Sequence, residues 1–385
     1  MHGAFRTRHD PPRPWPLTVG PSEIKIESVE ARAYTVPTEQ PEADGTLEWD
    51  STTLLLVLAH AAGQTGIGYS YTQVGATDVV TGKLASVVEG SDALRVGAAW
   101  SQMWAAVRNY GQTGLASMAI SAVDIALWDL KARLMDRPLV DVIDAVHDAT
   151  PIYGSGGFCN YTDQQLAEQL AGWVEAGIPR VKMKTGRDPS RDPSRLAVAR
   201  SAIGDDVALF TDANGAFSRS DAVEWAQRYG EAGVKWFEEP VSSDDLVGLH
   251  LVRDRAPGGL DVAAGEYGWN LPYFQRMLDA ESVHCLQADV TRCGGISGFL
   301  RVGALCDARS MDLSAHCAPQ ISAQACTAVW HLRHLEYFHD HNRIEHLMFD
   351  GCLEPEAGGV LRPDRSRPGC GLSVRWSDVE QWRVR

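Results

Sequence analysis

The spacing of hydrophobic residues divides the chain into two regions with different patterns. In the first region, segments 24–34, 52–58 and 66–68 alternate or are rich in β-branched residues, which predicts an antiparallel meander. Helical spacing follows over 78–107 and, most strongly, from Ala116 to Met135, which predicts a buried helix. Strands followed by helices indicate an α+β domain, which we place at residues 23–148.

In the second region, short apolar runs alternate with amphipathic segments such as 163–175 and 222–229. The candidate strands are 152–154, 181–183, 207–210, 234–237, 260–263, 285–287, 313–315 and 335–338. Eight such alternations in about 200 residues predict a closed parallel (β/α)8 barrel of the TIM type, which we place at 149–350. An open doubly wound sheet is the alternative, but no Gly-rich phosphate loop follows a first strand.

The two ends of the chain differ from these regions. Residues 1–22 contain Pro and Arg but no apolar stretch, so we expect a frayed tail and not a signal peptide. The most apolar run, Leu54 to Ala62, is too short to cross a bilayer. Segment 351–385 is rich in Pro, Gly and Arg, and we expect it to return to the first domain.

Composition narrows the choice of partners. Hydrophobic residues make up 44% of the 385 residues, as in a soluble globular protein. A formal net charge of -15 argues against nucleic acid or an anionic membrane as partner. A small anionic substrate stays compatible because a bound dication reverses the local field. The eight cysteines form no Cys-x-x-Cys pair, so we expect reduced thiols in a cytoplasmic homo-oligomer, with disulfides as the less favoured alternative.

Polar residues stand where the candidate barrel strands end, and their spacing is regular. They are Lys184, Asp212, Glu238, Glu266, Asp289, His316 and Glu336. Successive gaps of 28, 26, 28, 23, 27 and 20 residues each match one strand–helix unit of a barrel. Because the carboxyl ends of barrel strands all face one mouth, these side chains are expected to converge there.

Three of these residues are acids on adjacent strands, Asp212, Glu238 and Glu266. Converged carboxylates repel each other unless a cation lies between them, and oxygen ligands suit Mg²⁺. One such acid alone is more often a solvated loop residue, but three at matching spacing predict a Mg²⁺ site. Glu239 follows Glu238 and should point to the opposite face, in a supporting role. Asn214 shares the face of Asp212 and is expected to support the metal or the substrate.

Candidate bases flank these acids. Lys182 and Lys184 point to the same face of one strand, and two facing ammonium groups should lower each other's pKa, which makes one a usable base. A pair of surface lysines, or a lysine that forms a Schiff base, is the alternative. Asp289 and His316 end successive strands and are expected to touch, which would fix the imidazole tautomer and raise its basicity.

The last strand carries Glu336, which could donate a hydrogen bond to a substrate carboxylate if protonated, or form a structural salt bridge. A cluster of histidines surrounds that strand, and without the register of the acids it is interpreted as helix and loop surface. Its members are His331, His334, His339, His341 and His346.

Substrate specificity is assigned to the first domain, in segment 37–49 and in Tyr110. The segment is acidic and contains Gly and Pro, so we expect a mobile loop that closes over the mouth, with Trp49 covering the site. An inert surface loop is the alternative.

These residues together resemble the enolase superfamily, in its mandelate racemase-like subgroup, over nearly the whole chain. The motifs that carry the resemblance are SAVDIALWD at 121–129, VKMK at 181–184, DAN at 212–214, WFEEP at 236–240, GE at 265–266, QAD at 287–289, GG at 294–295 and SAH at 314–316. The resemblance implies a barrel capped by an α+β domain built from both termini, with Mg²⁺ held by the three acids.

The same resemblance implies roles for the remaining residues. Lys184 would be the base on one face of the substrate, and the His316–Asp289 dyad would act on the other. Lys182 would contact the substrate carboxylate and tune Lys184. Glu336 resembles the acidic partner of that carboxylate, and Arg292 matches a position where a basic residue is common.

The predicted chemistry is removal of the proton next to a carboxylate, through an enediolate that a dication and ammonium groups stabilise. The favoured outcome is dehydration of a sugar acid to a 2-keto-3-deoxy acid, by analogy with the superfamily. A racemase or epimerase, or a sugar-lactone cycloisomerase, is the alternative within the superfamily. From other classes, a metal-independent Schiff-base aldolase or a non-catalytic binding protein is the alternative.

Overall fold

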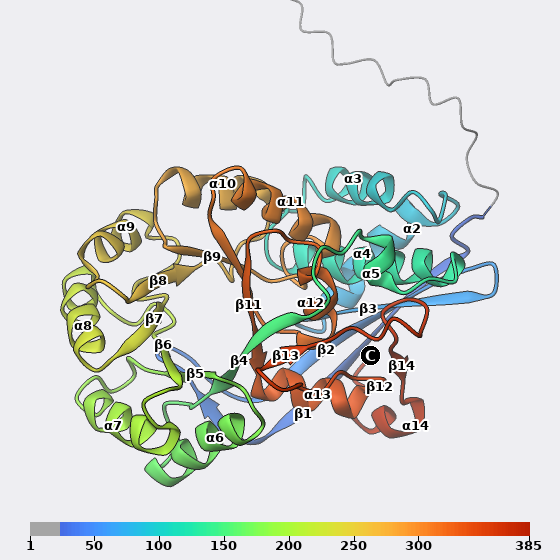
Figure 1. Ribbon diagram of the computed structural model, residues 1–385. Coiled ribbons are helices and arrows are strands. Elements are labelled where there is room, and N and C mark those ends of the chain that lie inside the picture. The colour runs from blue at the N-terminus through green and yellow to red at the C-terminus, as the bar shows by residue number, and fades with distance from the viewer. Residues whose placement is uncertain (1–23) are drawn as a thin grey trace, which may run out of the picture.

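The structure is a computed structural model that describes residues 24–385. The tail predicted at residues 1–22 lies outside the described residues. Figure 1 shows a barrel ringed by helices, with a smaller domain packed against it. The helices and strands therefore form two parts, as the hydrophobic pattern predicts.

The smaller domain, here called the cap, is built on an antiparallel sheet in the order β1-β2-β3. The strands are β1 (Ser28–Ala43), β2 (Glu48–Ala61) and β3 (Gln64–Tyr71). Alternate residues of β2 face different cores, since Leu54 packs toward the barrel and Leu55 toward the cap helices. Both faces of this strand are covered, which explains its unbroken apolar run.

The cap helices follow the sheet in the sequence. They are α1 (Ala76–Val79), η1 (Val80–Leu84), α2 (Ala85–Val88), α3 (Val96–Ala106), α4 (Leu115–Leu134) and α5 (Leu139–Val142). The predicted buried helix is α4, which lies directly on β3. A Cβ at Gly68 would lie 2.1 Å from the carbonyl oxygen of Ala122, so only glycine permits this close approach. The predicted α+β cap is confirmed.

The barrel closes through eight parallel strands in the order β4 to β11, with β11 paired to β4. The strands are β4 (Thr150–Gly156), β5 (Arg180–Lys184), β6 (Ala208–Asp212), β7 (Val234–Glu238), β8 (Asp261–Ala264), β9 (Cys285–Ala288), β10 (Asp312–Ala315) and β11 (Leu332–Phe338). Each coincides with one predicted run, so the predicted (β/α)8 fold is confirmed.

Helices alternate with these strands and cover the outside of the barrel (Figure 1). They are α6 (Asp163–Glu175), α7 (Asp192–Ile203), α8 (Arg219–Glu231), α9 (Leu246–Arg255), α10 (Leu271–Asp279), α11 (Gly295–Asp307), α12 (Pro319–Cys326) and α13 (His339–Met348). Among the described residues, no helix is long and apolar enough to cross a membrane. All eight cysteines are free thiols.

The chain then runs from the barrel back to the cap sheet. Strand β12 (Phe349–Asp350) pairs with β14 (Ser373–Val374), and β13 (Val360–Leu361) pairs with β4. After α14 (Trp376–Val379) and the short helix η2 (Glu380–Trp382), the backbone amide of Val384 donates to the carbonyl of Ala33 in β1, at 2.9 Å. The final residues therefore lie against the first cap strand.

Helix α4 also joins the cap to the barrel. The backbone amide of Gly294 donates to the Ser121 hydroxyl, and that of Ser297 donates to Asp124, each at 2.9 Å. These are amides at the start of α11, which lack partners within their own helix. The motif at 121–129 thus supplies side-chain caps from one domain to a helix of the other.

Replacement of Asp124 by alanine is expected to lower the free energy of unfolding by about 1–2 kcal/mol, because it removes a helix cap at a buried contact. Urea unfolding followed by circular dichroism measures the change. Asp206→Ala, at an exposed loop position, is the control. Equal stability of the two variants would contradict the capping role of Asp124.

Candidate active site

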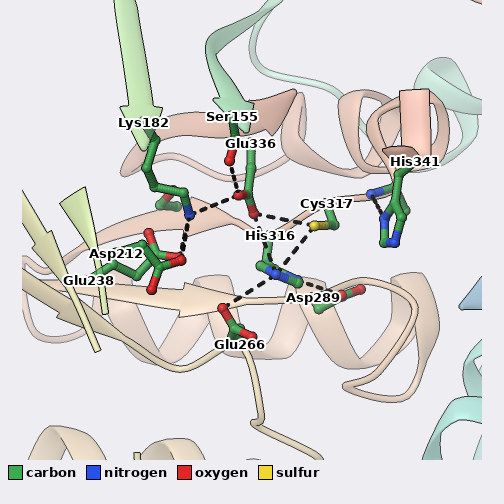
Figure 2. A network of polar contacts seen from close by, with 12 residues as sticks. Ser155, Lys182, Asp212, Glu238, Glu266, Asp289, His316, Cys317, Glu336 and His341 are labelled. Carbon is green, nitrogen blue, oxygen red and sulfur yellow. Dashed lines mark hydrogen bonds and ion pairs between the residues drawn. The ribbon is translucent and has the colours of Figure 1, made fainter. Parts of the chain in front are cut away.

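A cavity of about 490 Å³ lies at the carboxyl ends of the barrel strands, under the cap. Its barrel side includes Lys184, Glu266, His316 and Glu336, and its cap side comes from β2, β3, α4 and the turn that precedes β2. The structure therefore brings residues from distant strand ends into one place, as the register predicts. Figure 2 shows polar contacts of Glu266, His316 and Glu336 within this site.

Three buried carboxylates, Asp212, Glu238 and Glu266, come from neighbouring strands, and an oxygen from each lies within 4.8 Å of the others. Burial and the charge of Asp212 raise the pKa of Glu238 to about 8. Burial opposes ionisation of Asp212 too, but the charges of Lys184 and Lys182 outweigh it and lower its pKa to about 2.

One oxygen of Glu266 accepts no hydrogen bond, although the side chain is buried and lines the cavity. Oε2 of Glu266 lies 3.4 Å from Nε2 of His316. Buried carboxylates that repel each other, with an oxygen that accepts no hydrogen bond, are the environment that a hard divalent cation stabilises. The donor set is all oxygen. These three residues therefore fit the predicted Mg²⁺ site.

Both lysines of the VKMK motif lie against these acids. The Lys182 ammonium contacts Glu238 and lies 2.8 Å from Oε1 of Glu336, and Nζ of Lys184 donates to Asp212 at 2.6 Å. Burial alone would lower both lysine pKa values, but the carboxylates outweigh it and raise them. The expected net lowering is wrong here: the charge of Lys182 does lower the pKa of Lys184, but the charge of Asp212 outweighs it.

On β9 and β10, Asp289 and His316 form the contact that their register predicts. Nδ1 of His316 lies 2.8 Å from Oδ2 of Asp289. The amide and the hydroxyl of Thr291 both donate to Oδ1 of Asp289 at 2.7 Å, which fixes the carboxylate. Burial alone would raise the pKa of Asp289, but the hydrogen bond with His316 and the charge of Arg292 outweigh burial and lower that pKa. Nε2 of His316 is thereby left toward the cavity.

Glu336 is held on the opposite side of the imidazole. Its Oε1 accepts from the Ser155 hydroxyl at 2.6 Å and pairs with Lys182. Burial raises the pKa of Glu336, but the charges of Lys182 and His316 outweigh it and hold that pKa well below its usual range. The contacts therefore favour an ionised salt bridge over the protonated donor.

Of the predicted supporting residues, Arg292 and Asn214 line the cavity. Arg292 lies 3.5 Å from Glu266 and 3.5 Å from Asp289. Asn214 lines the cavity, and its Oδ1 has no hydrogen-bond partner. Glu239 is buried but is not a lining residue, and burial together with Glu266 holds its pKa well above the usual range.

Tyr110 is wrongly predicted as a site residue. Its side chain is 71% exposed and borders a neighbouring hollow, with Asp78, Lys83 and Val107. Helix α3 ends at Ala106, before Tyr110, and Tyr110 is not among the residues that line the cavity. The position of Tyr110 in the sequence, close to the cap helices, gave no information about where its side chain lies.

Two of the clustered histidines are not surface residues, which corrects their interpretation. His334 is buried inside the barrel beside Tyr153, and His341 lines the cavity. His341 stacks on Tyr71 with ring centroids 3.4 Å apart, and its Nδ1 accepts from the amide of Ala318. Burial, with the charge of His316, lowers the pKa of His341 to about 3. Its place just after the eighth strand is the signal that could have found it.

Segment 37–49 belongs to a β-hairpin, whereas we expected a mobile loop. Strand β1 runs to Ala43 and β2 starts at Glu48, with a register shift between Pro37 and Glu42. Glu42 is buried and accepts a hydrogen bond from the indole of Trp49 at 3.0 Å. Acidic composition is typical of a solvated segment, but Glu42 and Asp44 accept hydrogen bonds from groups within the hairpin.

The tip of this hairpin rests on the barrel mouth. The Thr46 hydroxyl donates to the carbonyl of Asn214, and Asp44 and Trp49 line the cavity. A Cβ at Gly45 would lie 2.2 Å from the carbonyl oxygen of Ala213, closer than any real contact. The tip can therefore reach the barrel only with glycine at this position.

Replacement of Gly45 by alanine is expected to raise KM about tenfold, because the tip must lift from the mouth it covers. Mg²⁺ affinity should stay within about twofold, since no candidate ligand moves. Steady-state kinetics and calorimetric Mg²⁺ titration measure the two effects. Gly97→Ala, where a Cβ meets open space, is the control, and a wild-type KM in Gly45→Ala would contradict the covering role.

Family comparisons agree with this architecture. Residues 29–144 match the mandelate racemase/muconate lactonizing enzyme N-terminal domain, and residues 165–379 match the enolase C-terminal domain-like family. The 3,6-anhydro-alpha-L-galactonate cycloisomerase of Streptomyces coelicolor is 31% identical, over 90% of this chain and 96% of its own length. The arabinonate dehydratase of Saccharolobus solfataricus is 27% identical, over 74% of this chain and 78% of its own.

Solved structures share the whole architecture. A mandelate racemase/muconate lactonizing enzyme-like protein from Rubrobacter xylanophilus has a TM-score of 0.92 and 56% identity, over 94% of this chain and 100% of its own. A racemase from Streptomyces coelicolor, crystallised with bound magnesium, has a TM-score of 0.88 and 29% identity, over 93% and 100%. With both domains matched in order, the chain belongs to the mandelate racemase/muconate lactonizing enzyme family of the enolase superfamily.

Proposed function

We propose that this protein binds Mg²⁺ through Asp212, Glu238 and Glu266 and removes the proton next to the carboxylate of a sugar acid. The observation that carries the proposal is the pair of candidate bases in one cavity. Lys184 and His316 both line it, and the strands that bear them lie on either side of the strands that bear the three acids. A substrate carboxylate beside the acids would expose its α-carbon to both.

The chemistry requires positive charge where the substrate becomes more negative. Bound Mg²⁺ would supply a dication next to the substrate carboxylate. Lys182 is fully buried beside this place and adds a fixed ammonium charge. With a cation bound at Asp212, that carboxylate would hold the Lys184 ammonium less strongly. The pKa of Lys184 would then fall, and its Nζ could accept a proton.

His316 completes the proposal on the other side. Asp289 holds Nδ1, so Nε2 is the atom that can give a proton to a departing hydroxyl or to the opposite face of the substrate. Loss of a β-hydroxyl gives dehydration to a 2-keto-3-deoxy acid, which we propose as the reaction. The dehydratase from Saccharolobus solfataricus is a relative with that class of activity in its name.

Cycloisomerisation is a second candidate, because the relative with 31% identity is a cycloisomerase. The two reactions differ in mass balance: dehydration releases one water, and cycloisomerisation releases none. A Schiff-base aldolase is less favoured than either, because both lysines are held as ammonium ions by carboxylates. Family membership and the bound magnesium of a related structure also support a metal-dependent enzyme.

The cap side of the cavity suits a polyhydroxylated substrate with one carboxylate. Its polar lining consists mainly of hydroxyl and amide groups, on Ser51, Thr52, Thr53, Thr72 and Gln73. The Thr72 hydroxyl is buried without a hydrogen-bond partner. Among the described lining residues on this side, Asp44 is the one charged group, and it is negative.

The test is a library of aldonates and aldarates incubated with the Mg²⁺-loaded enzyme. Mass spectrometry detects loss of water, and solvent deuterium uptake reports removal of the α-proton. We expect dehydration of an aldonate, with kcat/KM at least about tenfold above that for the matching aldarate, because a second carboxylate would face Asp44. Deuterium uptake without loss of water would contradict only the proposed dehydration. The absence of both uptake and product with every compound in the library would contradict the proposed function.

A further inference from the structure

Three potential metal ligands form a second cluster in the cavity, and one of them lies 3.4 Å from Oε2 of Glu266 in the first. They are Nε2 of His316, Sγ of Cys317 and Oε2 of Glu336. Sγ lies 3.3 Å from Nε2 and 3.3 Å from Oε2, and Nε2 lies 3.4 Å from Oε2. The atoms thus form a nearly equilateral triangle (Figure 2). All three side chains line the cavity, so one side of the triangle is open.

We propose that this triangle binds a thiophilic divalent cation of the Zn²⁺ class, and that such binding inhibits the enzyme by withdrawing His316 from the substrate. Tetrahedral Zn²⁺, with bonds of about 2.0–2.3 Å to nitrogen, oxygen and sulfur, separates its ligand atoms by about 3.3–3.7 Å. The triangle needs almost no rearrangement to meet this geometry. The open side leaves a fourth position for water or for a substrate oxygen.

In two of the three ligands, His316 and Glu336, the atom that faces away from the triangle is already held by a second group. Asp289 holds Nδ1 of His316 at 2.8 Å, and Ser155 and Lys182 hold Oε1 of Glu336 at 2.6 and 2.8 Å. Partners of this kind orient metal ligands and strengthen their binding. Nε2 and Oε2 are therefore fixed toward the triangle before any cation arrives.

Backbone conformation brings Cys317 to the same side as its neighbour. Consecutive residues of a strand point to opposite faces, but β10 ends at Ala315. Cys317 then adopts a φ of 49° and Ala318 a φ of 46°. Because of this turn, the thiol and the His316 imidazole both reach the cavity.

Ligand chemistry separates this cluster from the site proposed for Mg²⁺. A thiolate and an imidazole select Zn²⁺ over Mg²⁺, whereas three carboxylates favour the harder ion. Coordination uses the thiolate and the unprotonated Nε2, so the protons on these atoms pass to solvent. No bond other than these N–H and S–H bonds is broken, and no oxidant or reductant takes part.

Cobalt(II) is the spectroscopic probe, because a cobalt–thiolate bond gives a charge-transfer absorption band in the near ultraviolet. The full-length enzyme is titrated anaerobically with Co²⁺ in the presence of saturating Mg²⁺. We expect the band in the wild type and its loss in Cys317→Ser. Cys293→Ser, a buried cysteine outside this cavity, is the matched control and should keep the band. No band in the wild type, or an equal band in Cys317→Ser, overturns the proposed site.

Inhibition is measured separately, with Zn²⁺ added to the Mg²⁺-saturated enzyme and each variant compared with its own rate without Zn²⁺. We expect the concentration for half-inhibition to rise at least about tenfold in Cys317→Ser and to stay unchanged in Cys293→Ser, since one of three ligands is weakened. Equal inhibition of Cys317→Ser and wild type would mean that Zn²⁺ acts at the three acids, and would overturn the proposed inhibition. The cobalt experiment needs no substrate, so its outcome is independent of the proposed function.

Discussion

The Glu266→Gln variant is expected to lose at least about 1000-fold in kcat/KM, equivalent to about 4 kcal/mol of transition-state stabilisation. Glutamine keeps the size of the side chain but removes a negative charge from a buried three-carboxylate cluster. The cluster then has less charge with which to bind Mg²⁺, so Mg²⁺ affinity should fall together with activity. Calorimetric Mg²⁺ titration and steady-state kinetics on the identified substrate measure both quantities.

The fold should survive this change, because Glu266 takes part in no helix cap or cap–barrel contact described above. Glu231→Gln, on the exposed surface of α8, is the control and should behave as the wild type. Exhaustive EDTA treatment should reproduce the loss in the wild type, and added Mg²⁺ should restore the rate. Full turnover after EDTA treatment, or wild-type kinetics in Glu266→Gln, would show that the three acids do not hold a required cation.

Replacement of the candidate bases should separate the two faces of the substrate. Lys184→Ala is expected to slow exchange of the α-proton of one epimer with solvent by about 10²–10⁴-fold, and His316→Asn that of the other. Each variant removes the proton acceptor on one side and leaves the other in place. Proton NMR in D2O, with the two epimers offered separately, measures the exchange.

Matched controls are available on the surface, where Lys235→Ala and His250→Asn change the same residue types away from the cavity. Both controls should keep wild-type exchange. If Lys184→Ala and His316→Asn each exchanged both epimers at the wild-type rate, the two-base assignment would be wrong. If each lost exchange of both epimers to the same degree, the residues would serve one shared step and not opposite faces.

The sequence by itself determined the barrel and which residues at the strand ends lie in its site. A parallel barrel repeats one strand–helix unit, so an acid at the end of each strand recurs after one unit, as Asp212, Glu238 and Glu266 do. Barrel closure then forces these ends to a common mouth, whatever the loops between them do. For this reason the buried acids and the His316–Asp289 contact could be predicted without coordinates.

Tertiary structure decided the features that depend on distances between elements. The pKa of Lys184 rises because Asp212 lies 2.6 Å away, although the nearer residue in the sequence is Lys182. The acidic composition of segment 37–49 indicated solvent, but Glu42 is buried beside Trp49. The spacing of hydrophobic residues shows which face of a helix or strand is buried. It carries no information about which side chains of other elements pack against that face.

The same limit explains Tyr110, Cys317 and His341. Tyr110 was assigned to the site, yet the turn after α3 directs it outward, whereas His341 was assigned to the surface and lines the cavity. Cys317 reaches the cavity through a left-handed backbone conformation that its residue type does not favour. Periodicity is a property of the local chain, but the direction of a side chain after a strand or helix ends is set by the contacts of the folded protein.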